Sequence, residues 1–202
     1  MPRKQIQLQP EFPYHVFNRM ADQQFFEVPI EQVWELCEKF LFETTLLFGI
    51  RIHAFVLMGN HYHLAVTTPE SNLSDAMEFL QSRIAKGISI AKGAASVRFQ
   101  SRYRWSMAKT PEHFLNLISY IYLNPVRAGI TDDPGAYTYS TLNGILGFSK
   151  LRVPVWSCDL GDEFLWDDPF QFYQWAPLTQ AAMNPKKIQT ALRRAVFELR
   201  AK

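Results

Sequence analysis

The chain has 202 residues, of which 48% are hydrophobic and 20% are charged. These values are typical of a globular protein with an apolar core, and they exclude a disordered chain. The formal net charge is only +2, which by itself identifies no partner.

The cysteine content and the hydropathy indicate the cellular compartment of the protein. Cys37 and Cys158 lie far apart in the sequence, which argues against a disulfide framework and against a cysteine zinc site. The first residues lack the apolar stretch of a signal peptide, and no apolar run reaches the roughly 18 residues of a transmembrane helix. We therefore expect a cytoplasmic protein without a membrane-spanning segment.

Seven predicted elements follow one another along the first part of the chain. Hydrophobic periodicity, capping residues and turn residues define them. In order they are a strand (14–19), a helix (29–48), two strands (51–58 and 61–68), a helix (72 to about 91), a strand (99–108) and a helix (110 to about 124).

Two local signals fix the boundaries that matter most. Gly59 and Asn60 separate two strand-like segments, and so short a connection predicts an antiparallel hairpin. Thr110 and Pro111 suit the N-cap and first position of a helix, and Pro125 requires that helix to end just before it.

The order of elements predicts an α+β protein with a ferredoxin-like antiparallel sheet, the split βαβ arrangement. Two helices would cover one face of the sheet, and an additional tyrosine-bearing helix would follow the last strand. The chain changes character near residue 150, so we expect one domain over 1–150 and a C-terminal extension over 151–202. A basic helix, starting near Asn184 and with Leu192 and Val196 on its apolar side, is predicted in that extension.

A basic stretch lies between Glu78 and Glu112, where no acidic residue occurs. Such a stretch suits contact with a phosphate backbone, although a solvated helix and strand would have the same composition. Tyr103 and Trp105 alternate with its arginines, and they either stack on bases or belong to the core. We predict nucleic-acid contacts from Arg83, Lys86, Arg98, Arg102, Arg104 and Lys109.

His61 and His63 are two residues apart in a predicted strand, so both imidazoles face one side while Tyr62 and Leu64 face the other. Two neutral imidazoles side by side can bind one metal ion. Two polar residues on the solvent face of a hairpin would give the same pattern. The other histidines, His15 among them, carry less weight in the sequence.

The last predicted helix carries Asn116, Tyr120 and Asn124 one turn apart, beside its apolar stripe. Tyr120 is therefore expected at the margin of the core with its hydroxyl toward a cleft, while Tyr122 on another face is the competing candidate. A phenol with a pKa near 10 is a poor nucleophile, but a divalent metal can polarise the phosphate that it attacks. The amide oxygen of Asn124 is a candidate third ligand, which together with open positions suits Mg²⁺ or Mn²⁺.

The segments FVLMGNHYHLAV and SYIYLNPVRAGI together resemble the IS200-like transposase family. Within that family the chain is most similar to the REP-associated tyrosine transposases, which are HUH (His–hydrophobe–His) single-strand endonucleases of the Y1 type. The resemblance covers about residues 14–146 and includes YHVFNR, FQSRYRW and AYTYSTLNGILG. In this chain the middle residue of the HUH triplet is Tyr62, which is bulkier than the usual aliphatic residue.

The resemblance implies an HUH/Y1 catalytic domain over 1–150, with Tyr120 as nucleophile and with His61, His63 and Asn124 as metal ligands. A Mg²⁺- or Mn²⁺-dependent endonuclease and strand transferase, monomeric or homodimeric, would act on single-stranded DNA with a hairpin or palindrome. It would leave a 5′-phosphotyrosine and a free 3′-hydroxyl. Two alternatives stay open: a module that binds hairpin DNA or RNA without chemistry, and a metal hydrolase that uses activated water.

Overall fold

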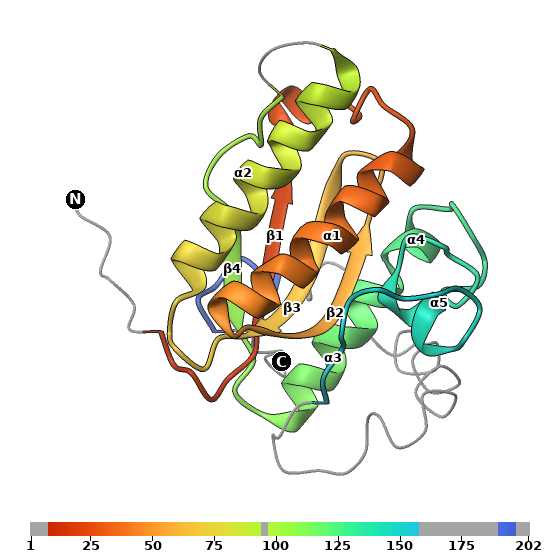
Figure 1. Ribbon diagram of the computed structural model, residues 1–202. Helices are drawn as coiled ribbons and strands as arrows, with labels where there is room; N and C mark the ends of the chain where they lie inside the picture. The colour runs from red at the N-terminus through yellow and green to blue at the C-terminus, as the bar shows by residue number, and fades with distance from the viewer. Residues whose placement is uncertain (1–7, 94–96, 158–189, 197–202) are drawn as a thin grey trace.

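The computed structural model describes residues 8–93, 97–157 and 190–196, and Figure 1 shows its layers. The strands and longer helices follow one another in the predicted order, and three short helices are additional. They are β1 (Tyr14–Arg19), the short 3₁₀ helix η1 (Ala21–Gln23), α1 (Ile30–Phe48), β2 (Arg51–Leu57), β3 (His61–Thr67), α2 (Leu73–Lys92), β4 (Arg104–Met107), α3 (Pro111–Tyr122), α4 (Asn124–Arg127) and α5 (Thr141–Ile145).

Local chemistry sets the helix boundaries. Gly49 ends α1 in the left-handed region with φ of 63°, a conformation that glycine adopts without steric cost. At the start of α3 the Thr110 side chain accepts a hydrogen bond from the backbone N–H of His113, and Pro111 occupies the first turn. These are the capping signals that the sequence predicted.

The four strands form a single antiparallel sheet in the order β2-β3-β1-β4. This order, with α1 and α2 as the connections that follow β1 and β3, is the ferredoxin-like arrangement, so the predicted fold class is confirmed. β2 and β3 form the predicted hairpin, in which the Met58 N–H donates to the carbonyl of His61 at 2.8 Å.

Alternation along the strands gives the sheet two different faces. The apolar side chains of one face, among them Leu64 and Val66, pack against α1 and α2, which lie side by side across the sheet in Figure 1. The other face packs Ala54, Val56 and Ala65 against α3. The additional helix therefore covers the face that α1 and α2 leave open.

The last strand is shorter than predicted. Residues 99–103 were expected to continue it, but β4 begins at Arg104, and only an isolated bridge joins Phe99 to Met20. The Asn18 side chain donates to the carbonyl of Ser101 at 2.9 Å. Backbone bonds also remain here, since the Gln100 N–H donates to the carbonyl of Arg19 at 2.8 Å, but the pairing is irregular and the strand prediction was too long at this end.

The described parts of the C-terminal extension pack onto the domain. The Trp156 N–H donates to the carbonyl of Ile52 at 2.8 Å, and the Met107 N–H donates to the carbonyl of Ala195 at 2.9 Å. The predicted basic helix is wrong for residues 192–196, which form turns and a bridge between Val196 and Met107. The rest of that prediction lies outside the described residues, and the division at residue 150 stays a prediction.

Across the described ranges, none of the helices combines the length and the apolar character needed to span a bilayer.

Candidate active site

The sheet face beneath α3 carries polar side chains from three strands. The register pairs Phe17 with both His63 and Arg104, and it pairs Arg19 with His61. Directly paired residues of antiparallel strands project to the same face. The side chains that share this face include His15, Phe17, Arg19, His61, His63, Arg104 and Ser106.

The two histidines of β3 meet on this face as predicted. Their ring centroids are 5.3 Å apart, and His63 is 4% exposed. Burial, together with the positive charge of Arg19, lowers the pKa of His61 to about 4. Burial and the neighbouring imidazoles hold the pKa of His63 well below its usual value. Both imidazoles are therefore neutral at pH 7, which is the form that binds a metal.

Asn60 fixes the tautomer of His61. The Asn60 amide nitrogen donates to the carbonyl of Gln23 at 2.8 Å, so its Oδ1 points to His61 Nδ1 at 2.6 Å. An amide oxygen only accepts hydrogen bonds, so His61 Nδ1 carries the proton and Nε2 carries the lone pair. A hydrogen bond of this kind to the second ring nitrogen orients metal-binding histidines generally.

His15 holds His63 in the same manner. His15 Nε2 lies 2.9 Å from His63 Nδ1, and the two rings stack with centroids 5.1 Å apart. When His63 Nδ1–H donates to His15 Nε2, the lone pair of His63 is on Nε2, as metal binding requires. Burial lowers the pKa of His15 to about 3, so its ring is neutral and has one nitrogen that can accept this bond.

Tyr120 of α3 packs directly on this histidine cluster. Its ring makes edge contacts with His63 at 5.4 Å and with His15 at 6.0 Å between centroids. Only 9% of its surface is exposed, which fits the predicted position at the margin of the core. Burial raises the pKa of Tyr120, while the cations of Arg127 and Arg19 act in the opposite direction.

Tyr122, the competing candidate, lies elsewhere. It is 1% exposed, and its hydroxyl lies 3.0 Å from Thr141 Oγ1 and 3.4 Å from the carbonyl of His53. Burial raises the pKa of Tyr122. These contacts are those of a structural tyrosine that joins α3 to β2 and α5.

Asn124 lies at the junction of α3 and α4. Its amide nitrogen donates to the carbonyls of Tyr120 at 2.7 Å and Ile121 at 3.3 Å. These bonds occupy the nitrogen and leave Oδ1 as the atom that a metal would use. The predicted ligand is thus tied to the backbone of the tyrosine helix.

The predicted nucleic-acid-binding residues are all exposed, but they lie on different sides of the sheet. Arg104 belongs to the histidine face, because it pairs with Phe17. Arg83 and Lys86 lie on α2, across the sheet, and Arg102 also turns toward α2, donating to Ser74 Oγ at 2.9 Å. The six exposed residues are Arg83, Lys86, Arg98, Arg102, Arg104 and Lys109.

The neighbouring aromatic residues belong to the core. Tyr103 is 8% exposed and lies in the cluster beneath α1 and α2, and Trp105 packs against the same cluster. Trp105 makes an edge contact with Tyr14 at 5.6 Å between centroids. Of the two interpretations of these residues, the structure favours the core.

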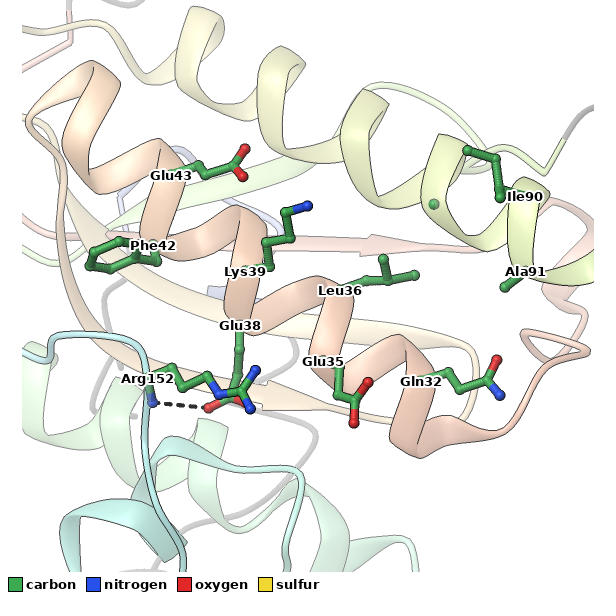
Figure 2. A pocket seen from close by; sticks show the side chains of 11 residues that line it. Gln32, Glu35, Leu36, Glu38, Lys39, Phe42, Glu43, Ile90, Ala91 and Arg152 are labelled. Atoms are coloured by element: carbon green, nitrogen blue, oxygen red, sulfur yellow. Dashed lines mark hydrogen bonds between the residues drawn. The ribbon is translucent and has the colours of Figure 1, made fainter.

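A separate hollow of about 960 Å³ lies between α1 and α2 (Figure 2). Its lining includes Glu35, Glu38 and Glu43, as well as Lys39 and Arg152. It opens on the helical side of the sheet, away from Tyr120 and the histidines. Its carboxylates make it a poor site for a phosphate backbone.

No protein-family model and no curated protein sequence matches this chain. Among solved structures, it is similar to a REP-associated tyrosine transposase bound to a REP hairpin, with a TM-score of 0.60. The match covers 83% of this chain and 98% of that chain at 16% sequence identity. The chain has the fold of that transposase. The family resemblance noted in the sequence is thereby supported at the level of the fold.

A metal ion implied by the transposase resemblance fits the donors of this site. Both imidazoles are neutral, and their Nδ1 atoms are hydrogen-bonded to Asn60 and His15. Within the parts of the chain that the structure describes, no group of three or more His, Cys, Asp or Glu side chains could hold a metal. The metal-binding set would therefore be His61 and His63, completed by a neutral oxygen such as Asn124 Oδ1 and by water or substrate.

Sequence reasoning missed four residues of this candidate site: His15, Arg19, Asn60 and Arg127. The strand alternation of YHVFNR could have put His15 and Arg19 on one face. Nothing local showed that this face pairs with the histidine face of β3. Arg127 follows α3 by a few residues only, and its return over Tyr120 depends on the turn into α4.

Proposed function

We propose that this protein is a metal-dependent single-strand DNA endonuclease and strand transferase that forms a 5′-phosphotyrosine on hairpin or palindromic DNA. The observation that carries the proposal is the contact of Tyr120 with His63, whose neutral imidazole is beside that of His61. Nucleophile and candidate metal ligands thus share one small site. The fold of a REP-associated tyrosine transposase supports the same activity.

The reaction exchanges one phosphodiester for another. Tyr120 Oη attacks the phosphorus, the bond between phosphorus and Oη forms, and the bond between phosphorus and the 3′-oxygen breaks. The phenol gives up its proton, and the departing 3′-oxygen takes one up and leaves as a hydroxyl. Attack by a 3′-hydroxyl on the phosphotyrosine reverses these changes and joins strands, so no external energy source is required.

The residues of this chain have distinct parts in that reaction. Tyr120 supplies the nucleophile, and its position is fixed by α3 packing on the sheet. His61 and His63 would hold a divalent metal, which polarises the phosphate and stabilises developing charge when bound. His15 and Asn60 keep the two imidazoles in the metal-binding tautomer.

The substrate class follows from the charge and from the similar structure. The related transposase is bound to a REP hairpin, and we propose a hairpin or palindrome for this chain as well. Arg104, exposed on the histidine face, is the basic residue best placed to contact DNA at the site. The other five predicted contacts would bind DNA that extends beyond it.

A covalent-adduct assay tests the proposal. The full chain is incubated with end-labelled single-stranded hairpin oligonucleotides from palindromes that flank its gene, with Mn²⁺ or Mg²⁺ or with EDTA. We expect a protein–DNA band on a denaturing gel, lost with EDTA and with Tyr120→Phe.

Tyr122→Phe is the matched control, because it removes the neighbouring phenol from the same helix. It should keep the adduct, since the Tyr122 hydroxyl bonds to the His53 carbonyl and lies beside Thr141 Oγ1 in the core. Tight hairpin binding with no adduct under any metal would favour the binding module instead. Metal-dependent cleavage that survives in Tyr120→Phe would favour the hydrolase.

A further inference from the structure

We infer that Arg19 and Arg127 bind the phosphate that Tyr120 attacks. Their two guanidinium groups together are called the phosphate seat below. The inference rests on the proposed function and assigns residues that its sequence motifs do not include. The two arginines come from different parts of the fold, the end of β1 and the end of α4. Arg127 packs on the Tyr120 ring, and the charge of Arg19 also acts on the Tyr120 hydroxyl.

Arg127 lies directly over the nucleophile. Its guanidinium carbon is 4.7 Å from the centroid of the Tyr120 ring, and its Nη1 donates to the Tyr120 carbonyl at 3.4 Å. The cation is half-buried, and this burial lowers the pKa of Arg127. This position places a guanidinium, which can bind two phosphate oxygens at once, directly against the nucleophile.

Arg19 approaches from the sheet. It pairs with His61 in the register, so its side chain leaves the sheet on the histidine face. Its Nη1 donates to Gln23 Oε1 at 3.2 Å, and its guanidinium lies 5.4 Å from the Phe17 ring centroid. These contacts hold the group beside the candidate metal ligands.

The Nε of Arg19 is a buried donor that lacks a hydrogen-bond partner among the described residues. An unpaired buried donor costs about 1–3 kcal/mol. A phosphate oxygen would satisfy this donor. Nε and one Nη of a guanidinium form the fork that matches two oxygens of a phosphate.

The fields of the two arginines converge on the reacting groups. Both cations oppose the rise in the pKa of Tyr120, and both act on His63. A phosphate bound at Tyr120 and the histidines would therefore be attracted by both positive charges. Such charges stabilise the anionic oxygens as the phosphoryl group is transferred.

A double-substitution cycle tests whether the two arginines bind this phosphate or only stabilise the fold. It combines an uncharged phosphate analogue in the DNA with an arginine substitution in the protein. Hairpin oligonucleotides carry one methylphosphonate at the position that the wild type cuts, or at each position of the flank in turn if no cut is found. Binding is measured by fluorescence anisotropy in Tyr120→Phe, with and without Arg127→Gln or Arg19→Gln. The readout is affinity, so it does not depend on catalysis.

We expect the methylphosphonate to weaken binding about tenfold when both arginines are present, equivalent to about 1.4 kcal/mol. In Arg127→Gln or Arg19→Gln the same modification should have little further effect. Arg104→Gln, exposed on the same face, is the control: it should weaken both oligonucleotides equally. If the loss of affinity from the methylphosphonate and the loss from Arg19→Gln or Arg127→Gln simply add at every position, the inference is overturned.

The test distinguishes failure of this inference from failure of the proposed function. An adduct in the wild type without coupling would leave the nuclease standing and remove the phosphate seat. Coupling without any adduct would keep the seat and remove the chemistry. If Arg127→Gln fails to fold by circular dichroism, Arg19→Gln, on β1, decides the same question.

Discussion

The two faces of the sheet are made by the same strands, yet they differ in what they bury. The face beneath α1 and α2 buries an apolar cluster, where Tyr62 places its one polar atom 2.6 Å from Gln81. The face beneath α3 buries imidazoles that contact one another and a tyrosine. Buried polar groups of the second kind contribute less to stability than a packed apolar face, so their presence points to function.

Substitutions at His63 and Leu64, neighbours on opposite faces of β3, should have the largest effects and test the difference between the two faces. His63→Gln should reduce adduct formation by more than the roughly 10–100-fold that loss of an outer-shell partner costs a metal site. The fold should survive, because the amide can still bond to His15. The measurement is the rate of adduct formation at saturating Mn²⁺, with hairpin affinity as the check on folding.

Leu64→Ala, one residue further and on the other face, is the opposite control. Leu64 is fully buried, and its truncation should cost about 2–5 kcal/mol in the free energy of unfolding. Adduct formation by the folded fraction should be nearly unchanged. If instead His63→Gln unfolds the protein and Leu64→Ala lowers the rate at full folding, the two faces do not divide stability from chemistry.

The next effect concerns the partner of His61. Asn60→Ala removes the acceptor on His61 Nδ1 and should weaken Mn²⁺ binding by about 10–100-fold. Isothermal titration with the metal alone measures this without any DNA. Asn72→Ala is the control, since its amide caps the carbonyl of Phe48 away from the site. Equal metal affinity in Asn60→Ala and the wild type would contradict the orienting role.

The buried imidazoles should also make stability depend on pH. The pKa of His15 falls from 6.5 in the unfolded chain to about 3 in the fold. Below pH 6.5 the unfolded chain therefore binds more protons, and stability is lost as the pH falls toward 3. Between pH 7 and pH 5 the loss due to His15 should be about 2 kcal/mol.

Urea unfolding of the wild type and His15→Gln in EDTA measures this contribution as a difference. His61 and His63 face His15 and titrate in the same direction in both proteins. The variant should show a shallower pH dependence, and parallel curves would show that His15 accepts a proton freely in the fold.

The smallest effect compares exposed arginines on the two sides. Arg104→Ala should weaken hairpin binding severalfold. It should also reduce the slope of log K against log salt concentration by about 0.7, the value for one lost phosphate contact. Arg83→Ala, on α2 and stacked on Phe79, should change both less. Equal losses would mean that DNA also reaches the helical layer, as the basic stretch in the sequence suggests.

The sequence predicted those parts of the fold and site that depend on local spacing. The hairpin, the helix caps and the alternation of His61, Tyr62 and His63 follow from neighbouring residues, and the structure shows each of them. Helical spacing favoured Tyr120 over Tyr122, and the resemblance singled it out, although both lie on buried sides of α3. Local spacing could not say which side faces the histidines.

Contacts between distant strands were beyond that reasoning. His15 meets His63 across 48 residues of sequence, a contact set by the pairing of β1 with β3. Helical spacing drew attention to Asn124, and the structure adds that its amide nitrogen binds the end of α3. The predicted strand over 99–108 was too long because strand propensity alone does not show where regular pairing with β1 ends, which in the structure is at Arg104.

The central claim is that Tyr120 bonds covalently to DNA, and mass spectrometry of the adduct tests it most directly. The trapped complex is digested with nuclease and trypsin, which releases the peptide between Lys109 and Arg127 with its nucleotide attached. That peptide contains both Tyr120 and Tyr122, so fragmentation must assign the phosphate. We predict the nucleotide on Tyr120 through its 5′-phosphate. A nucleotide on Tyr122, or an unmodified peptide from DNA that has been cut, would contradict the account.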